Sequence, residues 1–280
     1  MGFVRSFRRR MKRLQTAAKK RRRAIIEPLE PRILLSETLT FSAAAGAALD
    51  ASLRLDDTTD EIQLIDNNDQ SVLQRQALAE TDGVVITGSE YSDHLTVDFE
   101  TPFAFPNGIS FMDAYAGDDD VLTVTGQPNF WQLTGQDQGY VDGVAFAGIE
   151  NLTGGDDADI FALDDDAGTS GTLDGGGGED ILAGPAADTI WEIDGSGSGS
   201  VNGIAFTGFE NLQGAADNQD TFVFTGDGTL SGYIDGGAGG FDTLDIREGT
   251  YETVSFLPTG PPSGSVILDG SVITYLGLEP

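Results

Sequence analysis

A short phrase of glycine and carboxylate residues occurs three times in this chain and limits the folds that it can adopt. Residues 173–182 read LDGGGGEDIL, and related phrases occupy residues 113–122 and 235–244. Glycine enters left-handed backbone regions without steric cost, so a glycine run between apolar residues predicts a tight turn between two strands. The leading aspartates, Asp113, Asp174 and Asp235, are evenly spaced along the chain, 61 positions apart. A fixed period of this kind is typical of stacked units that share one core.

A longer similarity has nearly the same period. Residues 141–152 (VDGVAFAGIENL) align with residues 201–212 (VNGIAFTGFENL), and Trp131 aligns with Trp191, each at an offset of 60 positions. Residues 269–279 repeat the D-G and G-x-E phrase once more, and the sequence then stops inside a repeat with no evident terminal cap. We therefore expect a fragment or an early stop.

A shorter period of about 21 residues is nested inside the long one. Residues 152–161 align without a gap with residues 173–182, and residues 212–222 align with residues 234–244, at offsets of 21 and 22 positions. Both turns of the second pair are one residue longer than both turns of the first pair. An insertion that is matched in its neighbour indicates that the two turns stack directly on each other.

These periods predict an all-β fold, a parallel β-solenoid similar to a β-helix or β-roll, with rungs of about 21 residues and roughly three rungs per long repeat. Helix is expected only in the N-terminal arm. An antiparallel sandwich of the same short strands is the alternative, and it does not explain the matched insertions. Asn151 and Asn211 are either buried amides at corners or simple turn residues. The residues expected to face inward are Val144, Phe146, Ile149, Leu152, Phe161, Ile204, Phe206, Phe209, Leu212 and Phe222.

Charge divides the 280 residues into two parts. Residues 1–36 hold twelve of the 15 Lys and Arg residues and two acidic residues, a net charge of +10, whereas the rest of the chain holds three basic and 44 acidic residues, a net charge of −41. The two parts must serve different purposes. The chain has no cysteine, which excludes disulfides and thiolate metal sites. It has no run of 18 or more apolar residues, so we expect no transmembrane span.

The N-terminal arm, residues 1–36, has the composition of a basic amphipathic helix that ends at Pro28 and Pro31, and a solvated, disordered arm is the alternative. Residues 29–35 (LEPRILL) match the phrase L-E-P-R-x-L-L, and the arm resembles the LEPR-XLL domain at the start of very long, repetitive bacterial surface or secreted proteins. The resemblance implies a targeting role toward the export machinery for Leu29, Glu30, Pro31, Arg32, Leu34 and Leu35. We expect no nucleic-acid binding, because no aromatic residues are interleaved with the cations and the acidic body repels the polymer.

The remaining chain divides into three expected parts, a linker at residues 37–48, a β-meander cap at residues 49–82 and the repeat solenoid at residues 83–280. Short alternating apolar runs separated by Asp, Asn and Thr clusters predict the meander. A cap is needed because the first rung of a solenoid otherwise exposes an unpaired edge.

The stacked turns bring carboxylates together. At a rung spacing of about 4.8 Å, Asp159 would lie over Asp180 and Asp220 over Asp242, and the members of each pair would repel each other. A calcium ion takes oxygens from carboxylates and backbone carbonyls, so calcium between the rungs would reverse the sign of the interaction. The alternative is that these aspartates only form Asx-type turns in a solvated loop.

One of these turns also matches a known calcium-binding sequence. Residues 175–183 (GGGGEDILA) match the nonapeptide G-G-x-G-x-D-x-U-x at every fixed position, so the turns resemble those of RTX (haemolysin-type) proteins. The other turns depart from this pattern, and the tandem nine-residue copies of the RTX roll are missing. The resemblance implies that the carbonyls of the glycine turn and Asp180 are calcium ligands. Asp93 and Asp119 are weaker candidates. The candidate calcium ligands are Asp156, Asp157, Asp159, Gly176, Gly178, Asp180, Asp217, Asp220, Gly239 and Asp242.

An enzyme is the rival class of function, since parallel β-helices also host polysaccharide lyases. After residue 36 the cationic side chains are Arg54, Arg75 and Arg247, His94 is the single histidine, and no catalytic set can be assembled. We therefore predict a non-catalytic repeat protein, secreted or at the cell surface, that serves as an extended scaffold or adhesin segment. Its expected partners are calcium, cell-surface or extracellular glycans or proteins, and the export machinery. The alternatives are a lyase-like enzyme and a structural solenoid without metal.

Overall fold

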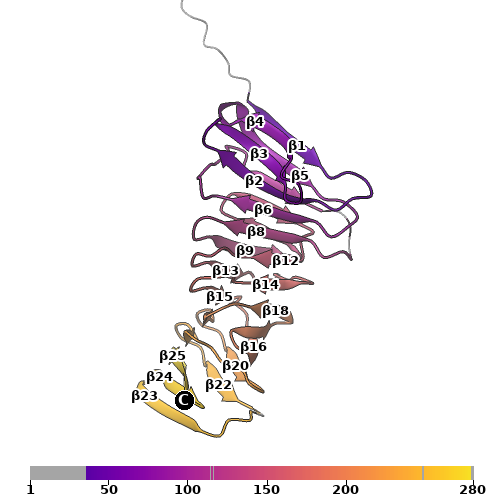
Figure 1. The fold of residues 1–280 in the computed structure, drawn as a ribbon. Coiled ribbons are helices and arrows are strands. Elements are labelled where there is room, and N and C mark those ends of the chain that lie inside the picture. Colours follow the sequence, from indigo (N-terminus) through magenta and orange to yellow (C-terminus); the bar gives the residue numbers. More distant parts are fainter. Residues whose placement is uncertain (1–35, 114, 116, 248, 279–280) are drawn as a thin grey trace, which may run out of the picture. The chain divides into compact units, whose positions relative to one another are not determined.

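The computed structural model describes residues 36–113, 115, 117–247 and 249–278, which belong to one compact unit. Within these residues it contains 25 strands and one short 3-10 helix, η1 (Leu78–Glu80), so the predicted all-β character is confirmed. The strands stack one above another in two sheets (Figure 1). No helix in this part of the chain is long and apolar enough to cross a membrane. The LEPR-XLL phrase and the expected helical or disordered arm lie outside the described residues.

The two sheets run the length of the stack. Sheet A has the order β1 (Glu37–Ser42), β5 (Thr81–Thr87), β7 (Ile109–Met112), β11 (Val144–Ala147), β10 (Gln138–Val141), β9 (Phe130–Gly135), β13 (Ile160–Leu163), β15 (Ile181–Ala183), β19 (Asn211–Gln213), β21 (Tyr233–Asp235), β25 (Ser271–Leu276), β24 (Ser263–Leu268) and β23 (Val254–Gly260). Sheet B has the order β22 (Thr243–Ile246), β20 (Thr221–Phe224), β16 (Ile190–Gly195), β17 (Ser198–Val201), β18 (Ile204–Thr207), β14 (Thr172–Asp174), β12 (Asn151–Thr153), β8 (Val121–Thr125), β6 (His94–Asp98), β2 (Asp50–Asp56), β3 (Glu61–Asp66) and β4 (Val72–Ala77).

Most neighbouring strands are parallel, and the strand pairs for which the sequence predicted a register adopt it. In sheet A, Phe161 of β13 pairs with Leu182 of β15, and in sheet B, Leu152 of β12 pairs with Leu173 of β14, so both steps advance the chain by 21 positions. The longer step of 22 positions relates β20 to β22 in sheet B and β19 to β21 in sheet A. The parallel β-solenoid and the direct stacking of the matched turns are therefore confirmed.

One part of the long repeat is antiparallel, which the sequence periods did not predict. Strands β9, β10 and β11 form a three-stranded meander in sheet A, and β16, β17 and β18 form the equivalent meander in sheet B. The second turn of the first meander contains Asp142 and Gly143, both at positive φ (41° and 86°). This is the conformation that a two-residue hairpin turn requires, and Asp-Gly and Asn-Gly pairs favour it.

The meander makes successive repeats alternate between the sheets. Each long repeat contributes seven strands, β9 to β15 and then β16 to β22. The three strands of the meander stay in one sheet, and the chain changes sheet after the meander and after each of the four strands that follow. Because these five changes are an odd number, the next copy begins in the opposite sheet, and Trp131 lies in sheet A whereas Trp191 lies in sheet B. Residues 60 positions apart are thus equivalent without being stacked, whereas residues 21 or 22 positions apart are stacked.

The first strands close one end of the stack. Strands β2, β3 and β4 form an antiparallel meander within residues 49–82, and β2 also pairs in parallel with β6. Strand β1 lies inside residues 37–48, the segment expected as a linker, and pairs in parallel with β5. Strands β23, β24 and β25 form a third repeat meander at the other end of sheet A.

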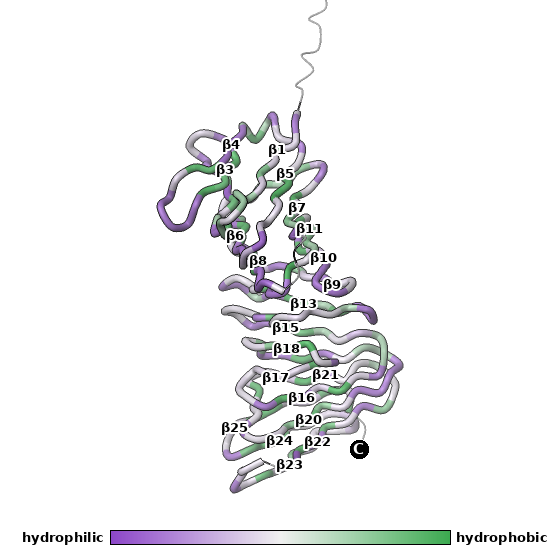
Figure 2. The backbone as a smooth tube through the Cα atoms, turned by 90° about the vertical axis from the view of Figure 1, so that its right-hand side faces the viewer, coloured by the Kyte–Doolittle hydropathy of each residue, from purple (hydrophilic) through white to green (hydrophobic). Residues whose placement is uncertain are grey.

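The apolar core fills the space between the sheets. All ten residues expected to face inward are buried, and none exceeds 4 % exposure. Hydrophobic segments recur within the strands along the stack, and hydrophilic segments collect in the loops (Figure 2). The Asn211 amide is buried and bridges three rungs, because Nδ2 donates to the carbonyl of Asp180 and Oδ1 accepts from the backbone N–H of Tyr233. Asn151 makes the same two contacts one repeat earlier.

Candidate metal centre and carboxylate ladders

Buried or partly buried carboxylates stand at the starts of successive parallel strands and accept hydrogen bonds from the rung before them. The backbone N–H of Asp159 donates to Oδ1 of Asp180 at 2.7 Å, and the N–H of Asp180 donates to Oε2 of Glu210 at 2.8 Å. The N–H of Asn129 donates to Oδ1 of Asp159 at 2.6 Å. We call such a series a carboxylate ladder. Each carboxylate in it satisfies the backbone N–H at the start of the preceding strand.

Two further ladders repeat this arrangement. The residues of the ladder that contains Asp159 directly precede strands of sheet A, whereas the residues of the other two ladders directly precede strands of sheet B. In both of them a backbone N–H donates to the carboxylate of the next rung. In one ladder the N–H of Leu49 donates to Asp93, that of Asp93 to Asp120 (2.7 Å) and that of Asp120 to Glu150 (3.0 Å). In the other, the N–H of Asp220 donates to Asp242 (2.8 Å). The alternation of the ladders follows the alternation of the repeats between the sheets.

The second carboxylate oxygen of a ladder aspartate points into its own glycine turn. Oδ2 of Asp159 accepts from the N–H of Gly155 at 2.7 Å, and a Cβ added at Gly154 would collide with the same oxygen. Glycine is therefore required here for the close approach of a carboxylate to the backbone. The equivalent crowding occurs at Gly88, Gly175, Gly214 and Gly236.

Burial shifts the protonation of these groups. Asp180 and Asp220 are at most 1 % exposed, and burial raises the pKa of each to about 6, with nearby carboxylates adding to the shift. The pKa of Asp159 is also raised by burial, and backbone hydrogen bonds from Gly155 and Asn129 oppose that shift. Oδ2 of Asp180 is buried and has no hydrogen-bond partner.

The structure brings together the two predicted aspartate pairs, Asp159 with Asp180 and Asp220 with Asp242, through backbone N–H donors. The other predicted ligands lie at the outside of their turns. Their role as calcium ligands stays a prediction. These outer residues are all exposed: Asp156, Asp157, Gly176, Gly178, Asp217 and Gly239. Four of the six have positive φ, namely Gly176 (90°), Gly178 (125°), Asp217 (62°) and Gly239 (79°).

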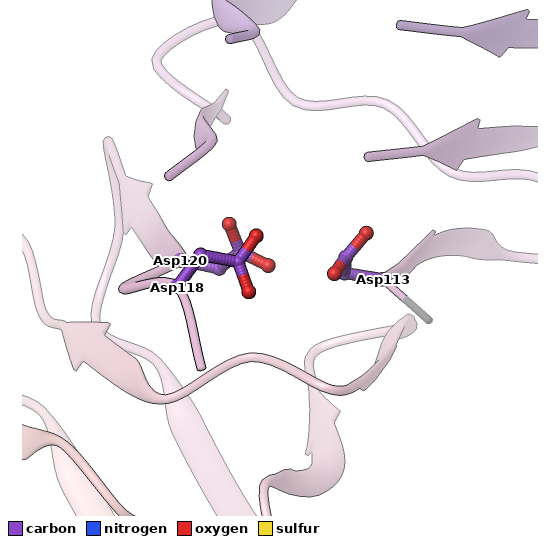
Figure 3. A group of neighbouring side chains, drawn as sticks. All are labelled: Asp113, Asp118 and Asp120. Atoms are coloured by element: carbon purple, nitrogen blue, oxygen red, sulfur yellow. The ribbon is translucent and has the colours of Figure 1, made fainter. Parts of the chain in front are cut away.

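A carboxylate cluster that was not predicted from the sequence lies in the first of the three phrases. Asp113 follows β7, Asp120 precedes β8, and Asp118 lies between them in the connecting loop. One oxygen from each lies within 4.8 Å of the others, and within the described ranges this is the one such group of three metal-binding side chains. Figure 3 shows Asp118 and Asp120 together on one side, facing Asp113. We call these three residues the acidic cluster.

The acidic cluster contains buried oxygens that the protein does not satisfy. Asp120 is fully buried; its Oδ1 accepts from the backbone N–H of Asp93, and its Oδ2 has no hydrogen-bond partner. Both carboxylate oxygens of Asp118 are likewise buried without a partner. Burial, with a smaller contribution from the charges of Asp113, Asp118 and Asp93, raises the pKa of Asp120 to about 7. Asp113 accepts from the backbone N–H of Tyr115 at 2.8 Å.

The signal for this cluster was present in the sequence as Asp113 together with three consecutive aspartates at residues 118–120. The cluster was not predicted because the phrase departs from the glycine-rich nonapeptide, which residues 175–183 match better. Asp119, the weaker candidate from the sequence, is not a member of the cluster. Its backbone N–H donates to Ser92 Oγ at 3.1 Å.

The residues considered for catalysis have structural contacts. His94 lies at the start of β6, with Nε2 at 3.1 Å from Thr123 Oγ1 and Nδ1 at 3.8 Å from a carboxylate oxygen of Asp50. Arg247 pairs with Asp245 at 2.6 Å on the surface.

Comparison with known proteins found no matching family model, no similar curated protein and no similar solved structure.

Proposed function

We propose that this chain is a non-catalytic, exported repeat protein that serves as an extended scaffold or adhesin segment, and that calcium binds its acidic cluster. The observation that carries the scaffold is the uninterrupted stacking of strands in both sheets, with ladder carboxylates at the strand starts. Each rung rests on its neighbours, as in other solenoids, so length is gained by repetition.

The export part of the proposal rests on the N-terminal resemblance. The L-E-P-R-x-L-L phrase at residues 29–35 and the division of charge between arm and body support it. A strongly acidic body keeps a protein soluble and disfavours association with other acidic polymers. Cell-surface or extracellular glycans or proteins are the proposed partners, and binding to them that is lost on chelation would support an adhesin.

Calcium suits the acidic cluster because of the chemistry of its donors. Carboxylate oxygens and backbone carbonyls are the ligands that calcium takes, six to eight at a time in flexible geometry. A buried carboxylate oxygen without a partner is costly, and a cation bound by Asp118 and Asp120 would satisfy three such oxygens at once. Asp113 would supply a ligand from the opposite side of the loop.

Isothermal titration of the chelator-treated full chain with calcium chloride tests this assignment. We expect saturable binding at millimolar calcium or below, the range of weak extracellular modules. Asp118→Asn should weaken the binding by about tenfold or more, since ligand charge sets calcium affinity. Asp119→Asn is the matched control, because it removes one charge from the same turn outside the cluster.

Two results would contradict the assignment. One is the absence of calcium binding, and the other is binding that Asp118→Asn and Asp119→Asn weaken equally. Binding that is lost in Asp180→Asn and kept in Asp118→Asn would instead place calcium in the RTX-like turn of residues 175–183.

A further inference from the structure

Five adjacent strands of sheet A carry no charge, although the body of the chain is strongly acidic. Strands β11, β10, β9, β13 and β15 are neighbours in the sheet and contain no charged residue, whereas residues 37–280 hold 44 acidic residues. Along each strand, residues buried in the core alternate with residues that face outward. We call the outward residues of these five strands the neutral face.

Two aromatic side chains stand next to each other on the neutral face. Tyr140 of β10 pairs with Gln132 of β9, so Phe130, two positions before Gln132, is the diagonal neighbour of Tyr140. Diagonal neighbours on one face of a sheet are within reach of aromatic side chains. Phe130 is 50 % exposed and Tyr140 is 51 % exposed, and Ile160, which pairs with Phe130, is 37 % exposed. The two rings and the isoleucine therefore form one exposed apolar surface.

The second repeat shows that the fold does not require this surface. Its equivalent strands, β16, β17, β18, β20 and β22, carry three acidic residues that are not buried, Glu192, Asp194 and Asp245. Ser200 stands at the position equivalent to Tyr140, at the same offset of 60 positions as the two buried tryptophans. The core is thus alike in the two copies, whereas the outward residues differ. Exposed apolar residues that folding does not need are typical of a binding surface.

Polar groups border the aromatic side chains. Nε2 of Gln132 donates to Oδ1 of Asp164 at 3.1 Å, and the backbone N–H of Phe130 donates to Oδ2 of Asp142 at 3.4 Å. Both aspartates are exposed and lie just beyond the ends of the strands. Aromatic rings offer a flat apolar surface to the C–H groups of a sugar ring, and carboxylates and amides bond to its hydroxyl groups. This combination suits a ligand that bears many hydroxyl groups.

Charge selects among such ligands. Residues 37–280 carry a net charge of −41, which repels anionic polymers, and the five strands offer no cation to a sulfate or carboxylate group. A cationic partner gains more from the acidic surfaces elsewhere on the chain than from strands without carboxylates. A second copy of the chain would bring a second acidic body against the first. An uncharged ligand meets none of these obstacles.

We propose that the neutral face binds a neutral polysaccharide, whose sugar rings pack on Phe130 and Tyr140. The inference rests on the proposed adhesin function and names the class of glycan and the surface that binds it. The neutral face contains no residue of the acidic cluster, so calcium is not a ligand of the glycan here.

Affinity electrophoresis of the full chain in native gels tests the proposal with galactomannan, hydroxyethyl cellulose and mixed-linkage β-glucan as neutral probes and alginate as the anionic probe. We expect at least one neutral polysaccharide to retard the chain and alginate not to retard it. Tyr140→Ser should weaken the binding by about tenfold, the effect of losing about 1.4 kcal/mol. The fold should tolerate this change, since Ser200 occupies the equivalent position.

Tyr91→Ser is the matched control, because Tyr91 is comparably exposed at 46 % but lies in the loop between β5 and β6, outside the neutral face. Far-UV circular dichroism must show that both variants keep the β spectrum. The proposal is overturned if no neutral polysaccharide retards the chain, or if Tyr140→Ser and Tyr91→Ser weaken binding equally. A dimer in light scattering that Tyr140→Ser dissociates would assign the neutral face to a second copy and also overturn it.

Failure of this inference differs from failure of the proposed function. Retardation by alginate alone would overturn the neutral ligand and keep an adhesin for glycans. A chain that no polysaccharide retards and that binds no calcium in the titration would lose both the neutral ligand and the calcium-binding adhesin.

Discussion

The backbone N–H of Asp159 donates a 2.7 Å hydrogen bond to the carboxylate of Asp180, which lies 21 residues later and one rung further along the stack. The same relationship joins Asp93 to Asp120 and Asp220 to Asp242. Aspartates that a sequence pattern would assign to metal binding thus serve as acceptors for the first N–H of a strand. A glycine five or six positions earlier leaves room for the carboxylates of Asp93, Asp159, Asp180, Asp220 and Asp242.

Replacing a ladder aspartate by alanine should destabilise the fold. In Asp159→Ala the backbone N–H groups of Asn129 and Gly155 both lose their acceptor, at 2.6 and 2.7 Å. Each buried donor left unsatisfied costs about 1–3 kcal/mol. Urea unfolding of Asp159→Ala should therefore show a free energy of unfolding lower by about 1–3 kcal/mol for each of the two donors. The exposed Asp157→Ala in the same turn should change the free energy of unfolding by less than about 0.5 kcal/mol. Equal effects of the two substitutions would contradict the structural role of the ladder.

Stability should rise as the pH falls from 7.5 to 5 in the presence of a chelator. Burial raises the pKa of Asp180 and Asp220 to about 6, above the ordinary value of 3.8, so the folded chain retains protons that the unfolded chain releases. The free energy of unfolding therefore falls as pH rises from about 4 to about 6, by on the order of 1 kcal/mol or more per group. Melting temperatures across this range measure the slope, and Asp220→Asn should flatten it. A melting temperature that falls steadily on acidification from 7.5 to 5 would contradict these shifts.

The stacked ring pair of Trp131 and Phe161 should be a large contributor to stability. The ring centroids lie 4.9 Å apart with an interplanar angle of 6°, and both side chains are completely buried. Trp131→Ala should lower the free energy of unfolding, measured by chemical denaturation, by about 3–5 kcal/mol. Trp131→Phe should cost much less, because the stack remains and the buried Nε1, which has no hydrogen-bond partner, is removed. Comparable losses in the two variants would show that the stack is not the source of the effect.

Glycine in the middle strand of the meander should resist substitution. A Cβ added at Gly199 would collide with the carbonyl oxygen of Glu192 on the neighbouring strand, so Gly199→Ala must separate β16 from β17. Overpacking of this kind costs about 1–3 kcal/mol. Gly260→Ala is the control, since a Cβ there meets nothing within 4 Å. Thermal unfolding compares the two variants, and an unchanged Gly199→Ala would contradict the close strand approach.

Sequence periodicity predicted the stacked parts of the fold because direct stacking demands equal turn lengths. The matched insertions near Asp217 and Gly239 predicted the register that the stacked strands of sheets A and B adopt. The antiparallel meanders were missed, although the Asp142–Gly143 pair between alternating apolar residues is a strong hairpin signal. A period alone does not reveal strand direction, and an odd number of sheet changes per repeat moves equivalent residues to opposite sheets.

The candidate site was harder to predict from sequence, because a carboxylate's role depends on which donors surround it. Asp180 matches the nonapeptide position, yet its Oδ1 accepts a backbone N–H, whereas Asp118 has two buried oxygens without partners. Sequence shows neither the donor nor its absence. The acidic cluster combines Asp113 from the end of one strand with Asp120 from the start of the next, across the turn between the sheets.

Thermal unfolding of the full chain with a chelator or with about 5 mM calcium, followed by far-UV circular dichroism, tests the calcium-stabilised scaffold most directly. A ligand that binds only the folded state at about 100 times its dissociation constant adds about 2.7 kcal/mol of stability. We therefore predict a higher melting temperature with calcium for the wild type and for Asp119→Asn, and a much smaller increase for Asp118→Asn. An identical melting temperature with and without calcium in the wild type would contradict calcium stabilisation and leave a solenoid held together without metal.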